Sequence, residues 1–143
     1  MKTFQTSCYG RARGFPSGSV CIQISSRLPE WWTNQVQFVK ELVPRTFGNP
    51  QFSDPAKWKP SYVLQLGELY RSRKLDEIVQ SIPDGAYLLC FEGDHTQCHR
   101  TLLAEWLNSH DMARVTEWTA EKKLPALKLA HKTAITNGQP ELF

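Results

Sequence analysis

The chain has 143 residues and a formal net charge of +3, and 41% of its residues are hydrophobic. This length suits one domain with a substantial core, and so small a net charge does not by itself demand a nucleic-acid partner. No apolar run reaches the length of a membrane span and the N-terminus lacks the apolar core of a signal peptide, so we expect a cytoplasmic protein without membrane contact.

The first part of the chain predicts two strands, one helix and a long irregular stretch. Residues 3–8 (TFQTSC) and 19–25 (SVCIQIS) have strand composition, and each is followed by a loop with turn-forming residues. A moderately periodic pattern predicts a helix over residues 33–43. Residues 44–60 are rich in Pro, Gly and Asn, which indicates an irregular segment that is functional or mobile.

The second part alternates helical and strand patterns. Apolar spacing predicts helices over residues 61–73 and 75–81, and composition predicts strands over 86–91 and 113–118. Between those strands, an amphipathic helix should end near Leu107. This alternation predicts an α/β fold with three layers, in which a mostly parallel sheet has helices on both faces. The expected core includes Ile22, Leu88, Leu89, Leu102, Leu103 and Trp106.

Cys98, His99 and Arg100 lie at the start of the amphipathic helix, with Asp94 or Thr96 as its expected N-cap. Free N–H groups and the positive end of the helix dipole favour bound anions and thiolates at such a position. We therefore predict a site in which a partly accessible Cys98 acts as nucleophile, His99 moves protons and Arg100 clamps an anion.

Each of these side chains also has a purely structural interpretation. Cys98 could be a buried, inert thiol, and His99 could be a capping or packing residue. Arg100 could form an ion pair with Glu92 or Glu105 instead of binding a ligand. Glu92 is a candidate acid–base group that could equally orient Arg100. The sequence leaves these alternatives open.

In a parallel sheet, ligands bind beyond the carboxyl ends of the strands, so the loops after the first, second and central strands should converge. The candidates for substrate binding in the first two loops are Tyr9, Arg11 and Arg27. The arginines suit phosphate groups, although isolated arginines are more often solvated surface residues. The adjacent Trp31 and Trp32 could stack on a base or fill the core.

The four cysteines show no paired zinc-ribbon spacing, and in a reducing compartment we expect free thiols. A metal site is nevertheless conceivable, because Cys90, His95, Cys98 and His99 lie within ten positions and suit zinc or iron. A helix that began near His95 would place His95, Cys98 and His99 on one face. We favour an anion site, so no metal is predicted and no cofactor is identified.

The run LLCFEGDHTQCHRTLLAEWL resembles the family called domain of unknown function 488. The resemblance rests on Cys90 at the end of an apolar strand, Glu92, Asp94, and the block Cys98-His99-Arg100 that opens a helix. It covers roughly residues 3–118 and is most specific in that block. It implies an α/β fold and an enzyme whose reaction is not specified.

The end of the chain resembles the short peptide by which bacterial replication and repair proteins bind the sliding clamp. Gln139, Leu142 and Phe143 match that pattern, whereas Pro140 departs from it. An apolar pair in an exposed tail can enter a pocket on a partner. The expected organisation is an α/β domain over residues 1–118, a basic extension over 119–137 and an exposed tail over 138–143.

Three classes of function follow from these patterns. The first is an enzyme that acts on a nucleotide or on DNA bases and is recruited to DNA through the sliding clamp. The second is a nucleic-acid-binding accessory protein without catalysis. The third is a metal or redox sensor that uses the cysteines.

Overall fold

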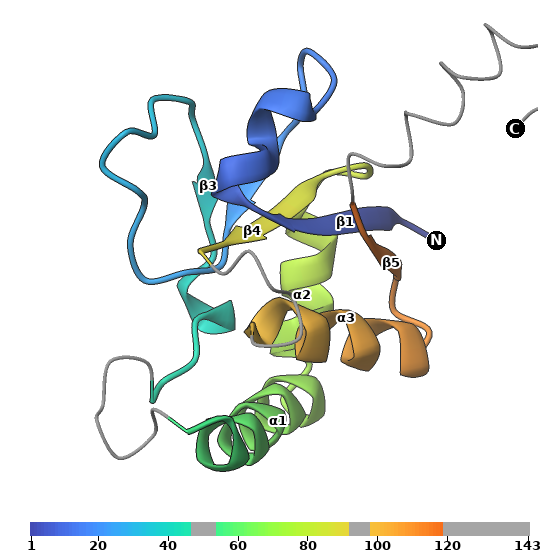
Figure 1. The fold of residues 1–143 in the computed structure, drawn as a ribbon. Coiled ribbons are helices and arrows are strands. Elements are labelled where there is room, and N and C mark those ends of the chain that lie inside the picture. Colours follow the sequence, from blue (N-terminus) through green and yellow to red (C-terminus); the bar gives the residue numbers. More distant parts are fainter. Residues whose placement is uncertain (47–53, 92–97, 119–143) are drawn as a thin grey trace, which may run out of the picture.

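The structure is a computed structural model that describes residues 1–46, 54–91 and 98–118. Its centre is a sheet of five parallel strands in the order β3-β2-β4-β1-β5 (Figure 1). The predicted α/β fold with a parallel sheet is therefore confirmed. The strands are β1 (Thr3–Cys8), β2 (Cys21–Gln23), β3 (Gln37–Phe38), β4 (Tyr87–Cys90) and β5 (Arg114–Glu117).

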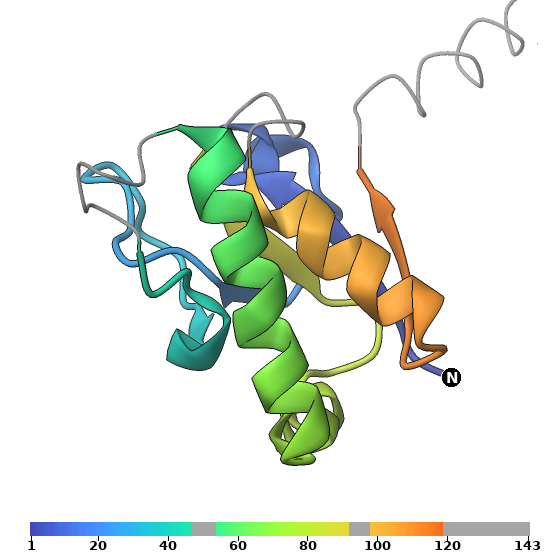
Figure 2. The same ribbon diagram turned by 90° about the horizontal axis from the view of Figure 1, so that it is seen from below.

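Helices cover both faces of the sheet, as predicted, but the two layers differ. Helices α1 (Pro55–Arg71), α2 (Lys74–Ser81) and α3 (His99–Ser109) lie together on one face, where α1 and α3 run side by side (Figures 1 and 2). The other face carries the 3-10 helix η1 and a cluster of aromatic side chains. Within the described residues, no helix is both long and apolar enough to cross a membrane. The 3-10 helices are η1 (Tyr9–Gly14) and η2 (Lys40–Leu42).

The central strand β4 is buried on both faces, as expected for a parallel strand with a layer on either side. Leu88 and Cys90 pack into the core beneath the α-helices, whereas Tyr87 and Leu89 belong to the aromatic cluster on the other face. Phe15 stacks on Tyr87 with ring centroids 4.0 Å apart. The predicted core is confirmed: Ile22, Leu88, Leu89 and Leu103 are buried, and Leu102 and Trp106 pack partly buried against the same core.

The predicted helix over residues 33–43 is wrong. Gln37 and Phe38 instead form the edge strand β3, which pairs in parallel with Ile22 and Gln23 of β2, and the short η2 follows. The sequence pattern was weakly periodic here, so pairing with a neighbouring strand prevailed over helical propensity.

Helix α1 begins at Pro55, six residues before the predicted start at residue 61. Asp54 is its N-cap, and a carboxylate oxygen accepts the N–H of Ala56 at 3.0 Å. Proline suits the first helical turn because its missing N–H has no partner there in any case. Pro60 was interpreted as part of an irregular segment, yet the helix continues through it.

Helix α3 begins later than predicted, because Cys98 is its N-cap and keeps an extended backbone (φ −117°, ψ 146°). The expected cap at Asp94 or Thr96 is therefore wrong. The suggested arrangement of His95, Cys98 and His99 on one helical face involves His95, which lies outside the described residues. The predicted position of Cys98-His99-Arg100 at the N-terminal end of the helix is confirmed.

Candidate functional site

The carboxyl edge of the sheet is defined here by the last residues of its inner strands. The neighbouring strands β1 and β4 both end at this edge. Cys8 and Cys90 end these strands and are paired in register. The chain leaves β1 toward β2 on one side, and it leaves β4 through α3 toward β5 on the other side (Figure 1). Adjacent strands whose connections depart in opposite directions form the crevice in which open α/β sheets bind ligands.

Contacts between side chains hold the predicted loops together at this edge. The hydroxyl groups of Tyr9 and Ser25 lie 2.7 Å apart, which joins the loops after β1 and β2. The start of α3 joins them through His99, whose Nε2 lies 2.6 Å from the carbonyl oxygen of Ile24. The inferred convergence is therefore present for the first two loops and for the start of α3, whereas residues 92–97 of the third loop lie outside the described residues.

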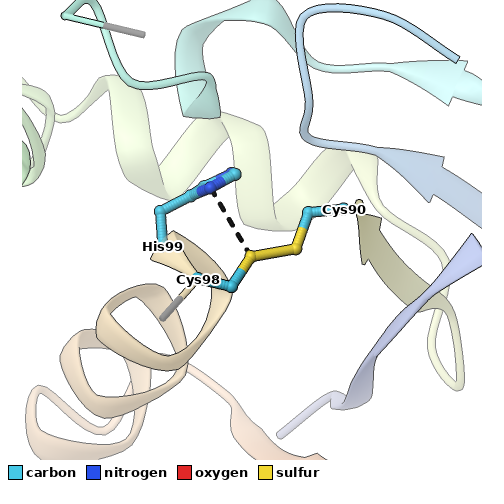
Figure 3. Close-up of side chains that lie close together, drawn as sticks. All are labelled: Cys90, Cys98 and His99. Atoms are coloured by element: carbon cyan, nitrogen blue, oxygen red, sulfur yellow. Dashed lines mark hydrogen bonds between the residues drawn. A yellow bond between two sulfur atoms is a disulfide. The ribbon is translucent and has the colours of Figure 1, made fainter. Parts of the chain in front are cut away.

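Cys90 and Cys98 are joined by a disulfide bond (Figure 3). The expectation of free thiols is wrong for this pair, because the end of β4 and the N-cap of α3 meet in space; it holds for Cys8 and Cys21. The expected accessibility of Cys98 is also wrong, since only 3% of the residue is exposed. Its Sγ becomes available for chemistry only when the disulfide bond is reduced.

His99 lies beside the disulfide with its ring buried against Tyr62, at a centroid distance of 5.3 Å. The pKa of His99 is lowered to about 4, mainly because the ring is buried; the hydrogen bond to Ile24 opposes this shift, and the nearby charge of Arg100 contributes to it. The imidazole is therefore neutral at pH 7. A carbonyl oxygen only accepts, so Nε2 carries the proton and Nδ1 faces Cys98 Sγ at 3.8 Å (Figure 3).

Arg100 is completely buried and forms a two-pronged ion pair with Glu117 at the end of β5. Its Nε and one terminal nitrogen donate to the carboxylate oxygens at 2.9 and 2.8 Å, and its other terminal nitrogen donates to Cys90 Sγ at 3.1 Å. The interpretation of Arg100 as an anion clamp does not fit this geometry, because the guanidinium faces Glu117. An ion pair was one of the alternatives, and its partner among the described residues is Glu117. Glu105 is exposed on α3, and Glu92 lies outside the described residues.

Glu117 is the residue at the site that the sequence did not identify. Besides Arg100, it accepts the hydroxyl of Thr6 at 2.8 Å and forms a longer ion pair with Arg11 at 3.4 Å. Its position at the end of the last predicted strand was the available signal, because parallel strands end at the same edge of a sheet. Arg11 thus lies next to the block that begins α3, as predicted.

Tyr9 is a buried packing residue at the carboxyl edge of the sheet. This burial raises the pKa of its hydroxyl to about 12, while the hydrogen bond to Ser25 partly opposes the shift. Its ring makes edge-on contacts with Trp32 and Phe91 at centroid distances of 5.2 and 5.5 Å. Direct substrate binding by Tyr9 is therefore not supported. The exposed rings at this place are Phe91, which contacts Tyr9, and Trp31, which contacts Trp32.

The remaining predicted residues have different outcomes. Arg27 is exposed on the loop after β2, and its backbone carbonyl accepts the Ser25 hydroxyl at 2.8 Å. Glu92 and His95 lie outside the described residues, as do the three predicted clamp-binding residues. The donor atoms of three residues gather within 4.8 Å and could together hold a metal ion; these are Cys90, Cys98 and His99.

The model of the family described as domain of unknown function DUF488 matches residues 23–107, which confirms the resemblance noted in the sequence. No curated protein and no solved structure matches the chain.

Proposed function

The chain belongs to the family of domain of unknown function DUF488, and from this membership and its geometry we propose an enzyme that acts on a nucleotide or a nucleic-acid base. The substrate would bind at the carboxyl edge, beside Cys98 and His99. The proposal includes the cytoplasmic location expected from the sequence.

The observation that carries this proposal is the aromatic surface at the carboxyl edge. Phe91 and Trp31 are 43% and 60% exposed, and Tyr9 and Trp32 support them from below. Exposed rings that rest on buried aromatic side chains offer an apolar surface that a flat ligand can cover. Every base offers a flat face to such rings, and stacking contributes about 1–3 kcal/mol per base.

Positive side chains on the same loops support a ligand that carries phosphate. Arg13 and Arg27 are exposed on the loops that follow β1 and β2. Arg11 is only partly engaged, because its contact with Glu117 is long and 39% of its side chain is exposed. A guanidinium can hold two phosphate oxygens at once, and such contacts position a nucleotide without reading its sequence.

The chemistry of the proposed enzyme would come from the reduced form of the site. Reduction converts the bonded sulfurs of Cys90 and Cys98 into two thiols next to the neutral ring of His99. Arg100 would not contact the substrate. It would be a positioning residue that holds the sulfur of Cys90, since its guanidinium contacts Cys90 and Glu117. The catalytic role of Glu92 remains a proposal from the sequence alone.

Binding tests the aromatic surface directly. A short single-stranded oligothymidylate with a fluorescent label is titrated with the intact chain, and polarisation is followed. Replacing Trp31 or Phe91 by Ala should weaken binding roughly 10-fold, since each stacked base contributes about 1–3 kcal/mol. The matched control is Phe38→Ala, because Phe38 is 50% exposed but lies on the edge strand β3. Equal losses in all three variants, or no binding by the intact chain, would contradict the proposal.

Turnover separates the enzyme from a simple binding protein. The reduced chain is incubated with nucleotides and with oligonucleotides, and new products are sought by mass spectrometry. We expect Cys98→Ser to abolish turnover while the oligonucleotide still binds. Binding without turnover in the native chain would favour the nucleic-acid-binding accessory protein.

The redox or metal sensor is the second candidate, and the bond between Cys90 and Cys98 favours it. A sensor would change its partner binding with the oxidation state of this pair and would turn over no substrate. Recruitment to DNA through the tail is also part of our proposal. It rests on Gln139, Leu142 and Phe143 in the sequence, which lie outside the described residues.

A further inference from the structure

The donor atoms of Cys90, Cys98 and His99 converge on one small region (Figure 3). Cys90 comes from the end of β4, and the other two residues come from the start of α3. All three are buried, and their donor atoms lie within 4.8 Å of one another. Two sulfurs and an imidazole nitrogen are the ligands that zinc prefers in proteins.

The spacing of these atoms fits a tetrahedral ion. With Zn–S bonds of about 2.3 Å and Zn–N bonds of about 2.0 Å, a sulfur and a nitrogen ligand lie about 3.6 Å apart. Cys98 Sγ and His99 Nδ1 are separated by 3.8 Å, so this pair needs almost no rearrangement. The two sulfurs need to move to about 3.8 Å from one another, which opening of the disulfide bond allows.

The surroundings of His99 also resemble those of a metal ligand. A histidine that binds a metal through one ring nitrogen commonly donates a hydrogen bond from the other, which fixes the tautomer and the ring orientation. Nε2 of His99 makes this bond to the carbonyl oxygen of Ile24 at 2.6 Å, so the lone pair of Nδ1 is directed toward the sulfurs. The hydrogen bond from Nε2 thus holds the ring in the orientation that binding through Nδ1 requires.

The sulfur of Cys90 also accepts a hydrogen bond from a residue outside this group of three. Arg100 donates to Cys90 Sγ at 3.1 Å, and Glu117 fixes the guanidinium from the other side. Hydrogen bonds to a metal-bound thiolate stabilise its negative charge. The carboxylate of Glu117 offsets part of the positive charge that the guanidinium of Arg100 would place next to a cation.

We propose that the reduced chain binds one Zn²⁺ ion through the Sγ atoms of Cys90 and Cys98 and the Nδ1 atom of His99. The two thiolates balance the charge of the ion. Three protein ligands leave a fourth position for water or for a substrate atom, as in catalytic zinc sites. The proposal goes beyond the function proposed above and does not depend on a nucleotide substrate.

Zinc binding and the disulfide bond exclude one another. A phosphine reductant opens the bond with a water molecule: the two sulfurs become thiols, and the phosphine becomes its oxide. Binding of Zn²⁺ to the two thiols then releases two protons. The oxidised chain has the same residues but no thiolate at this place, so it serves as a control that retains the native sequence.

The first test measures zinc on the full chain. The protein is reduced with a phosphine, given Zn²⁺, desalted and analysed for bound metal, and affinity is measured by competition with a chromophoric chelator. We expect one zinc per chain in the reduced form and none in the oxidised form. Substoichiometric zinc in the reduced form, or equal zinc in both forms, would overturn the proposal.

Variants then assign the ligands. Cys98→Ser and His99→Gln should each weaken zinc binding more than the loss of a residue that only hydrogen-bonds to a ligand. Such a loss typically weakens metal affinity about 10- to 100-fold. Cys21→Ser is the matched control, because Cys21 is also a buried thiol but packs in the aromatic cluster. Circular dichroism verifies the fold of each variant. If a folded Cys98→Ser variant retains the native affinity, or if Cys21→Ser loses as much, the assignment is wrong.

Cobalt gives an independent signal in the native chain. Co²⁺ replaces Zn²⁺ in tetrahedral sites, and thiolate ligands produce an intense ligand-to-metal absorption in the near ultraviolet. We expect this absorption on adding Co²⁺ to the reduced chain and its loss on adding Zn²⁺. A spectrum that shows only the weak bands of a cobalt ion bound by water and oxygen would overturn the proposal.

Discussion

Nε2 of His99 lies 2.6 Å from the carbonyl oxygen of Ile24, and this contact determines which ring nitrogen can take part in chemistry. Because the carbonyl needs a proton from Nε2, the lone pair of the neutral ring is on Nδ1. Nδ1 faces the sulfur of Cys98. A single hydrogen bond between α3 and the residue that follows β2 thus orients the imidazole toward the cysteine pair.

The stability of the oxidised protein should decrease with falling pH because of His99. Burial lowers the pKa of His99 from 6.5 to about 4, so between these values the unfolded chain binds a proton that the folded chain does not. The free energy of unfolding should therefore decrease as the pH falls from 6.5 to about 4. Urea unfolding at pH 7 and 4.5 should show a loss of about 2–3 kcal/mol that the His99→Gln variant lacks. Identical pH profiles for the two proteins would refute this assignment.

Arg100 should be far more important for stability than Arg11, although both contact Glu117. Arg100 is fully buried, so its replacement by Ala leaves Glu117 and Cys90 without their main donor and should cost about 3–5 kcal/mol. The contact of Arg11 is longer and partly exposed, and Arg11→Ala should cost less than about 1 kcal/mol. Urea unfolding measures both. Similar losses in the two variants would show that the buried ion pair has no special role.

Thiol counting tests the oxidation state of the site. An oxidised sample unfolded without reductant should be alkylated at Cys8 and Cys21 only, and at Cys90 and Cys98 only after reduction. Peptide mass spectrometry identifies the labelled positions. Labelling of all four cysteines without reductant would mean that the bond does not form under those conditions.

The clamp-binding tail remains a prediction from the sequence. Titration of the host's sliding clamp with the intact chain should give micromolar affinity, typical of one short peptide that becomes ordered on binding. Truncation after Asn137 removes Gln139, Leu142 and Phe143 and should abolish binding. Binding that survives the truncation would place the interaction elsewhere on the chain.

Local patterns predicted the parts of the fold that depend on local forces. Residues 3–8 were identified with their observed bounds, because strand composition and the following Gly-rich loop agree. Apolar spacing predicted the helix α3 and the core position of Leu103, and it placed Cys98-His99-Arg100 near the N-terminal end of this helix, although the cap was expected at Asp94 or Thr96. Residues 37–38 were assigned to a helix, because strand pairing with β2 leaves no clear trace in so short a segment.

The contacts that define the site could not be predicted, because they join segments that only the sheet brings together. Arg100 pairs with Glu117 because β5 lies beside β1 and ends at the same edge. Glu105 was the nearer candidate in sequence, but it lies on the exposed surface of α3. Similarly, Cys90 and Cys98 meet because β4 ends where α3 begins, which the sequence does not specify.

The central claim is that Cys90, Cys98 and His99 form one chemical centre. X-ray absorption at the zinc edge of the reduced, zinc-loaded chain tests this claim most directly. Two sulfur neighbours at about 2.3 Å and an imidazole nitrogen at about 2.0 Å are expected, and the sulfur contribution should halve in Cys98→Ser. A spectrum with only oxygen and nitrogen neighbours, or one that Cys98→Ser leaves unchanged, would contradict the claim.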